Sequence, residues 1–148
     1  MNNIMSNLLD AKGHNVWTVS PQSSAYDALE FLAEKDVGAL VVVDQGKVVG
    51  MFSERDYARK IILKGKSSKE TIVADIMNKP VTYVLPWTSL NECMNLMTNK
   101  HVRHLPVMEG DKLLGIVTIG DIVKAIIIEQ EAVIKELKGY IDDVLKNH

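Results

Sequence analysis

The chain has 148 residues, of which 47% are hydrophobic and 24% charged, and its formal net charge is −2. This balance gives no electrostatic basis for nucleic acid or an anionic membrane as the main partner, and its apolar runs, such as residues 39–43 and 125–128, are too short to span a bilayer. The first residues lack the basic and apolar regions of a signal peptide. Because the single cysteine, Cys93, cannot form an internal disulfide, a cytoplasmic location is expected.

Two stretches of the chain match each other without a gap. Val16 aligns with Val81 and Ile62 aligns with Ile127, which is a constant offset of 65 residues. Identical pairs at this offset include Pro21/Pro86, Ser24/Ser89, Gly50/Gly115 and Asp56/Asp121. A match of this length in one register indicates a duplication, so the fold is predicted for each copy separately.

Each copy is predicted to begin with a short strand, at residues 16–19 or 81–84, which a proline ends. The helix that follows has Ser24 or Ser89 as its N-cap, and Glu92 completes a capping box with Ser89. Two strands then form a tight hairpin, at residues 40–43 and 48–52 or at 105–108 and 113–117. A last helix starts near Ser53 or Thr118. The predicted order in each copy is therefore β-α-β-β-α.

This order predicts an α+β fold, an α/β sandwich of two repeats related by a pseudo-twofold axis, with a long C-terminal helix. One copy of about 60 residues buries too little surface to be comfortably stable alone, so the two copies should pack sheet to sheet. The polar segment at residues 64–69 is the expected joint. The predicted divisions are residues 4–67, residues 68–128 and a helical extension at residues 129–148.

The last helix is predicted to continue past the second copy without interruption by proline. Its apolar positions alternate spacings of three and four residues, as in a coiled coil with one polar position: Ile127, Gln130, Ile134, Leu137, Ile141 and Val144. Two arrangements fit this pattern. Either the helix folds back onto its own domain, or it contacts a second chain.

The two hairpins carry a common motif. In the second copy it runs Leu105-Pro106-Val107 and then Gly115-Ile-Val-Thr118-Ile-Gly-Asp121; the first copy has Leu40-Val41-Val42 and then Gly50-Met-Phe-Ser53-Glu-Arg-Asp56. The doubled unit resembles the CBS domain, and in particular small bacterial stand-alone CBS-pair proteins (Bateman modules). The one departure is Val41, where the family usually has proline.

The resemblance implies a non-catalytic regulatory module with two clefts for adenine nucleotides. AMP is the first expectation for the ligand, with NAD(H), ADP, ATP or S-adenosylmethionine as alternatives. It also implies a homodimer that signals energy or redox state to an unknown effector protein. The alternative function is a purely structural dimerisation module without a physiological ligand.

Asp56 and Asp121 each follow a hydroxyl residue by three positions, at the step from strand to helix. In one interpretation Ser53 or Thr118 is an N-cap and the acid only favours the helix dipole. In the other, which the resemblance implies, the carboxylate accepts the hydroxyls of a ribose while the hydroxyl residue and free amides face phosphate. The repetition of the arrangement in both copies favours the second interpretation.

The cations near these acids differ between the copies. Arg103 and His104 align with Gly38 and Ala39, whereas Arg55 aligns with Gly120, so two non-equivalent clefts are expected. Arg103 suits phosphate because its guanidinium is planar. The resemblance adds the segments around residues 11–14 and 73–77 for the adenine. The candidate ligand-binding residues are Lys12, Gly13, His14, Gly38, Ala39, Leu40, Ser53, Arg55, Asp56, Val73, Ile76, Met77, Arg103, His104, Leu105, Pro106, Thr118, Gly120 and Asp121.

No motif for catalysis or metal binding is evident. There is no glycine-rich phosphate loop or Gly-x-Ser-x-Gly motif, and no histidine accompanies the Ser/Thr-x-x-Asp pairs as a base. His101 and His104 lie three residues apart at the start of a predicted strand, which should point them to opposite faces and exclude a shared zinc ion. The chain is therefore predicted to be neither an enzyme nor a metal protein.

Overall fold

The first copy folds as the repeat predicts. In the computed structural model, which describes residues 4–147, its elements are β1 (Thr18–Val19), α2 (Ala25–Lys35), β2 (Ala39–Asp44), β3 (Lys47–Ser53), α3 (Glu54–Asp56) and the π-helical turn η1 (Tyr57–Ile62). β2 pairs in parallel with β1 and antiparallel with β3. The Ser24 hydroxyl accepts a hydrogen bond from the Asp27 amide, so the predicted N-cap of α2 is confirmed.

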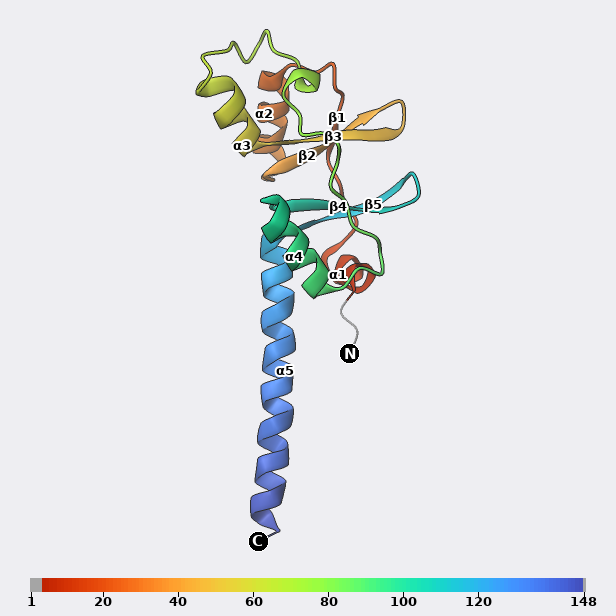
Figure 1. The fold of residues 1–148 in the computed structure, drawn as a ribbon, viewed down its shortest axis with the longest axis vertical. Helices are drawn as coiled ribbons and strands as arrows, with labels where there is room; N and C mark the ends of the chain where they lie inside the picture. The colour runs from red at the N-terminus through yellow and green to blue at the C-terminus, as the bar shows by residue number, and fades with distance from the viewer. Residues whose placement is uncertain (1–3, 148) are drawn as a thin grey trace.

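The second copy repeats these elements as α4 (Leu90–Lys100), β4 (His104–Glu109), β5 (Lys112–Thr118) and α5 (Ile119–Lys146). The capping box of Ser89 and Glu92 is present. The two hairpins also share their irregularities, because each has a bulge at the same aligned position, after Val42 and after Val107. The two stacked halves are visible in Figure 1, and the predicted α+β fold with two repeats and a long C-terminal helix is confirmed.

The first predicted strand of the second copy is shorter than expected. In the first copy the Val41 amide donates a hydrogen bond to the Trp17 carbonyl. Pro106 takes the aligned position in the second copy and has no N–H to donate. The parallel pairing is therefore reduced to a single bridge between Val84 and Val107, and the prediction of a full strand at residues 81–84 was wrong.

The segment before each copy packs into the core of the other copy. The helix α1 (Met5–Lys12), which was not predicted, buries Met5 and Leu9 among the core residues of the second copy. The 3-10 turn η2 (Val73–Asp75) and Ile76 complete the core of the first copy. The chain thus crosses twice between its halves. The core of each copy is completed by the segment that precedes the other copy in the sequence.

Two aligned glycines make room for these exchanged segments. A Cβ added at Gly115 would lie 2.6 Å from Leu9 Cδ2, and one added at Gly50 would lie 2.5 Å from Met77 Sδ. Both distances are shorter than real side chains allow. Gly50 and Gly115 thus leave space for the tips of Met77 and Leu9, which would have to shift if a side chain were added, and both neighbours come from the exchanged segments.

The helix α5 leaves the body and does not fold back onto it (Figure 1). Ile122 is its one fully buried residue, and Ala125 and Ile126 also pack on the core of the second copy. Beyond them the helix lies apart from the rest of the chain, which excludes the fold-back arrangement. In the described part of the chain no helix combines the length and the apolar character needed to cross a membrane.

Candidate functional site

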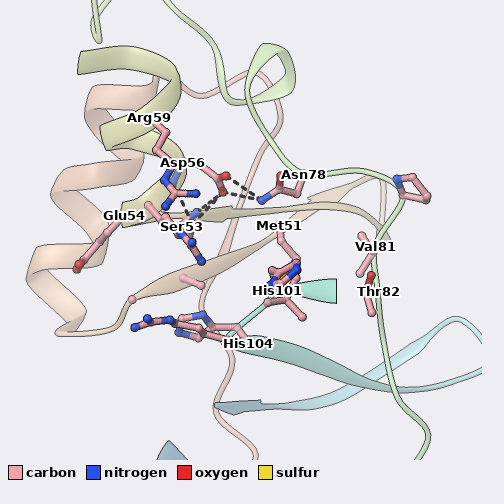
Figure 2. Close-up of a pocket in the computed structure, with 16 residues that line it drawn as sticks. Met51, Ser53, Glu54, Asp56, Arg59, Asn78, Val81, Thr82, His101 and His104 are labelled. Carbon is pink, nitrogen blue, oxygen red and sulfur yellow. Dashed lines mark hydrogen bonds between the residues drawn. The ribbon is translucent and has the colours of Figure 1, made fainter. Parts of the chain in front are cut away.

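A cavity of about 470 Å³ lies between the two halves (Figure 2). Its volume is within the range of pockets that hold small molecules. The residues that line it come from both copies and from the segment that joins them: Gly38, Ala39, Met51, Ser53, Glu54, Arg55, Asp56, Arg59, Asn78, Pro80, Val81, Thr82, His101, Val102, Arg103 and His104. Both copies therefore contribute to one cleft.

Asp56 is the central acidic group of this cavity and is only 7% exposed. Its carboxylate accepts hydrogen bonds from the Ser53 amide at 3.0 Å and the Ser53 hydroxyl at 2.9 Å. The side-chain amide of Asn78 donates to both carboxylate oxygens, at 2.8 and 2.9 Å (Figure 2). Lys60 Nζ lies 3.4 Å away. Asp56 therefore serves as a capping residue, and it also faces a donor that comes from outside its own helix.

Cationic side chains line the same cavity from both copies. Arg55 and Arg59 belong to the first copy and Arg103 to the second, and all three are exposed. His101 also lines the cavity together with His104, so the prediction that these two side chains point to opposite faces was wrong. The reason is local: His101 ends α4 in the left-handed conformation at φ 55°, and the chain is not yet a strand at this point.

His104 is a neutral group at physiological pH. Its burial, followed by the charges of Lys12 and Arg103, lowers the pKa of the imidazole from its ordinary value. The close contact between the halves contributes to this burial, since a Cβ added at Gly38 would lie 3.1 Å from His104 Nε2. Arg103, and not His104, is thus the cation that this segment offers at neutral pH.

The lowered pKa of His104 predicts a pH dependence of stability. The unfolded chain protonates His104 more readily than the folded chain does. The contribution of neutral His104 to the free energy of unfolding is therefore complete above about pH 6.5 and declines as the pH falls from there through the folded-state pKa. His104→Gln should flatten this decline. Urea unfolding of both proteins between pH 5 and 8 measures the difference. If the free energy of unfolding changes with pH equally in both proteins, His104 is not the cause of the pH dependence.

The acid of the second copy has different partners. Lys12 Nζ forms an ion pair with Asp121 and donates a hydrogen bond to the Ile116 carbonyl at 2.8 Å. Burial opposes the ionisation of Asp121, but the hydrogen bonds from Lys12 and the Thr118 backbone outweigh it and hold the pKa of the carboxyl below its ordinary value. Asp56 accepts hydrogen bonds from the neutral amide of Asn78 and has Lys60 Nζ 3.4 Å away, whereas Asp121 forms a closer ion pair with Lys12, so the two acids are not equivalent.

The family model of the CBS domain matches the chain twice, at residues 8–63 and 73–128. The chain belongs to the CBS-domain family. The mitochondrial CBS domain-containing protein CBSX3 of Arabidopsis thaliana is 42% identical over 137 residues, which are 88% of this chain and 66% of that protein. The chain thus spans slightly under two thirds of this relative's length. The family predicted from the hairpin motif is confirmed.

Solved CBS structures share the fold. A proposed signal-transduction protein with CBS domains from Burkholderia ambifaria is 46% identical, with a TM-score of 0.83 over 86% of this chain and 96% of that one. A hexameric CBS-CP12 protein from bloom-forming cyanobacteria is 27% identical, with a TM-score of 0.76 over 83% of this chain and 67% of that one. This chain is therefore a CBS pair with the fold of the signal-transduction protein above, and the CBS-CP12 protein that shares the fold is hexameric.

The structure separates the predicted site residues into three groups. Gly38, Ala39, Ser53, Arg55, Asp56, Arg103 and His104 line the cavity. The residues Lys12, Gly13, His14, Thr118, Gly120 and Asp121 lie at the acid of the second CBS domain or next to it. The remaining residues do not line the cavity, because the fold uses them for packing: Leu40, Val73, Ile76, Met77, Leu105 and Pro106.

Several residues of the cavity wall were missed from the sequence. Arg59 could have been found, since it lies four residues after Arg55 and therefore on the same helical face. Asn78 and the segment Pro80 to Thr82 gave no such signal, because only the crossing of the chain brings them to Asp56. Within residues 4–147 no group of three or more His, Cys, Asp or Glu side chains could hold a metal ion.

Proposed function

We propose that the chain is a non-catalytic sensor that binds an adenine nucleotide between its two CBS domains. The observation that carries the proposal is the lining of one cavity by a buried carboxylate, three arginines and an apolar wall. Asp56 suits the hydroxyls of a ribose, the arginines suit phosphate, and Met51, Pro80 and Val81 suit a flat base. AMP remains the first candidate, with NAD(H), ADP, ATP and S-adenosylmethionine as alternatives.

The contacts of Asp56 support a specific place for the ribose. Asn78 is exposed, and its amide touches both carboxylate oxygens with two short hydrogen bonds. A ribose offers two hydroxyl donors for the same two oxygens. In the proposed complex the side chain of Asn78 turns away and the ribose takes its place, so that the buried carboxylate keeps its hydrogen bonds in both states.

The second site is proposed to be weaker for an electrostatic reason. A ribose at Asp121 must displace Lys12, a charged donor that also binds the Ile116 carbonyl. Replacing an ion pair by neutral hydroxyls costs more than replacing an amide, since hydrogen bonds between charged groups are the stronger ones. Two sites of unequal affinity are therefore expected in calorimetry, and two equal sites would contradict the assignment.

The proposal includes the downstream role. Occupancy of the cavity would signal energy or redox state to an effector protein, and the chain would act as a homodimer; the hexameric CBS-CP12 protein supports self-association of such a chain. A cytoplasmic place of action fits the buried, unpaired thiol of Cys93, whose pKa burial raises to about 11. A buried thiol with a raised pKa is unreactive and forms no disulfide, so the fold does not depend on an oxidising compartment.

Thermal unfolding in the presence of nucleotides tests the proposal. At 100 times its dissociation constant a ligand adds about 2.7 kcal/mol of stability, which raises the midpoint by roughly 5–10 °C for a chain of this size. Arg103→Gln should weaken binding about tenfold or more, because it removes a charged side chain that binds the phosphate of the nucleotide in the proposed complex. Lys112→Gln, at the exposed first residue of β5, is the matched control.

Two results would overturn the proposal. If AMP, ADP, ATP, NAD(H) and S-adenosylmethionine all leave the midpoint unchanged, the structural dimerisation module becomes the better function. If Arg103→Gln and Lys112→Gln weaken binding equally, the ligand does not lie in this cavity.

A further inference from the structure

The exposed face of α5 has a seven-residue repeat. Written as a heptad, its a positions are all isoleucine: Ile127, Ile134 and Ile141. Its d positions are Val123, Gln130, Leu137 and Val144. We call these seven residues the α5 seam. Its six apolar side chains are about half exposed, for example 54% for Ile134 and 53% for Ile141, so the seam has the pattern of a coiled coil without a visible second strand.

The outer part of α5 has little reason to be helical alone. Residues 127–146 continue beyond the core contacts of the helix, and in proteins most helical stability comes from the packing of an amphipathic face. This segment is also rich in β-branched residues, such as Val133 and Ile134, and contains Gly139, all of which have modest or poor helix propensity. A regular helix in this segment therefore points to a partner that covers its apolar side.

The body of the protein leaves the whole seam open. Ile122, Ala125 and Ile126 turn toward the core of the second CBS domain. At 100° per residue, the seam is centred about 100° around the helix from these three side chains, so it lies on a neighbouring side that they do not cover. An open groove of about 720 Å³ marks this side at the base of α5, lined by Val123, Ile127 and their neighbours. A second helix can therefore follow α5 along the seam.

We infer that the α5 seam pairs with the same seam of a second copy of this chain, as a parallel, in-register two-stranded coiled coil. The β-branched isoleucine at all three a positions, together with Leu137 at d, follows the combination that favours two parallel strands, and the other d positions hold valine or Gln130. In this register Gln130 meets Gln130 of the second copy, so their amides can bond to each other. An antiparallel pair would place Gln130 against an aliphatic a residue and leave its buried amide unpaired.

The size of the seam is adequate for a specific contact. From Val123 to Val144 the helix rises about 32 Å, and half of the circumference of a helix about 10 Å wide is roughly 16 Å. Pairing then covers on the order of 500 Å² on each chain, or about 1,000 Å² in total, which is the lower limit for a specific interface. The flanks add no like-charge conflict, because the g positions Ile126, Val133 and Tyr140 are uncharged.

This inference rests on the proposed function only in expecting a dimer, and it is independent of nucleotide binding. Sedimentation of the full chain with and without Ile134→Glu/Ile141→Glu tests it. Both residues are exposed, so the fold of the body should survive and its unfolding midpoint serves as a check. Ala132→Glu, at the exposed f position of the same helix, is the matched control. The double variant should be monomeric and lose the helical circular dichroism of the outer segment, whereas the control stays dimeric.

The outcomes separate the two proposals. A double variant that stays dimeric overturns the α5 contact and leaves the proposed homodimer intact, whereas a monomeric wild-type chain overturns both. Neither the oligomeric state of the wild-type chain nor that of the double variant depends on whether these proteins bind a nucleotide. The expected result is a dimeric wild-type chain and a monomeric double variant.

A single cysteine tests the orientation. Val144→Cys lies near the tip of the helix, and in the parallel register the two introduced thiols face each other and form a disulfide under mild oxidation. The native Cys93 is buried and does not interfere. If Val144→Cys does not cross-link while a mixture of Gln130→Cys and Ile141→Cys chains does, the helices are antiparallel and the inferred register is wrong.

Discussion

Asp56→Ala is expected to lower the free energy of unfolding by about 2–3 kcal/mol, a fall of roughly 5–10 °C in the unfolding midpoint. The substitution removes the acceptor of four hydrogen bonds from Ser53 and Asn78 at a site that is 7% exposed. It also leaves Lys60 without its nearby carboxylate. Because these donors lie at a partly buried position, water replaces the lost acceptor only in part.

Asp121→Ala is the matched comparison and should cost only about 1 kcal/mol. The Asp121 side chain is more exposed than that of Asp56, and its main partner, Lys12, can return to water. Urea unfolding at pH 7 measures both values. Equal losses for the two variants would mean that the difference in burial and partners between the acids has no energetic consequence.

Leu9→Ala is expected to cost about 2–4 kcal/mol, because it opens a cavity where α1 packs on the second CBS domain. Leu9 is 1% exposed and lies against Gly115, far from α1 in the sequence. The same contact predicts that Gly115→Val, which adds bulk toward the Leu9 side chain, costs about 1–3 kcal/mol by overpacking.

A double-mutant cycle tests whether these two positions contact each other. In the Leu9→Ala background the space for the valine side chain is free, so Gly115→Val should be much less harmful there, or even stabilising. Denaturant unfolding of the four proteins gives the coupling free energy, expected to be on the order of 1 kcal/mol. Strictly additive losses would be inconsistent with α1 packing on the second domain.

The elements that could be predicted from the sequence are those that depend on local spacing. The 65-residue register predicted two copies of one unit, and the serine N-caps Ser24 and Ser89 marked the helix starts. The seam of α5 was also visible as an alternation of three and four residues. Each of these signals lies within a few turns of chain, where periodicity and capping chemistry decide the structure.

The crossing of the chain was not predicted, because it depends on contacts between residues about a hundred positions apart. Met5 and Leu9 have helical spacing, so α1 itself left a weak signal, but nothing local tells which core it enters. The partner of each acid follows from this crossing. Lys12 reaches Asp121 from α1, and Asn78 reaches Asp56 from the joining segment. Site residues that depend on such a crossing are the ones that the sequence analysis missed.

The exchange of the entry segments has a consequence for synthesis of the protein. Met5 and Leu9 leave the ribosome before the core that they enter, because that core needs Val117 of β5, 108 residues after Leu9. At about 5–20 residues per second this delay amounts to roughly 5–20 s. During that time the apolar side of the nascent α1 has no native surface to cover it. A chaperone that captures short apolar segments would therefore find the apolar side of α1 exposed during this delay.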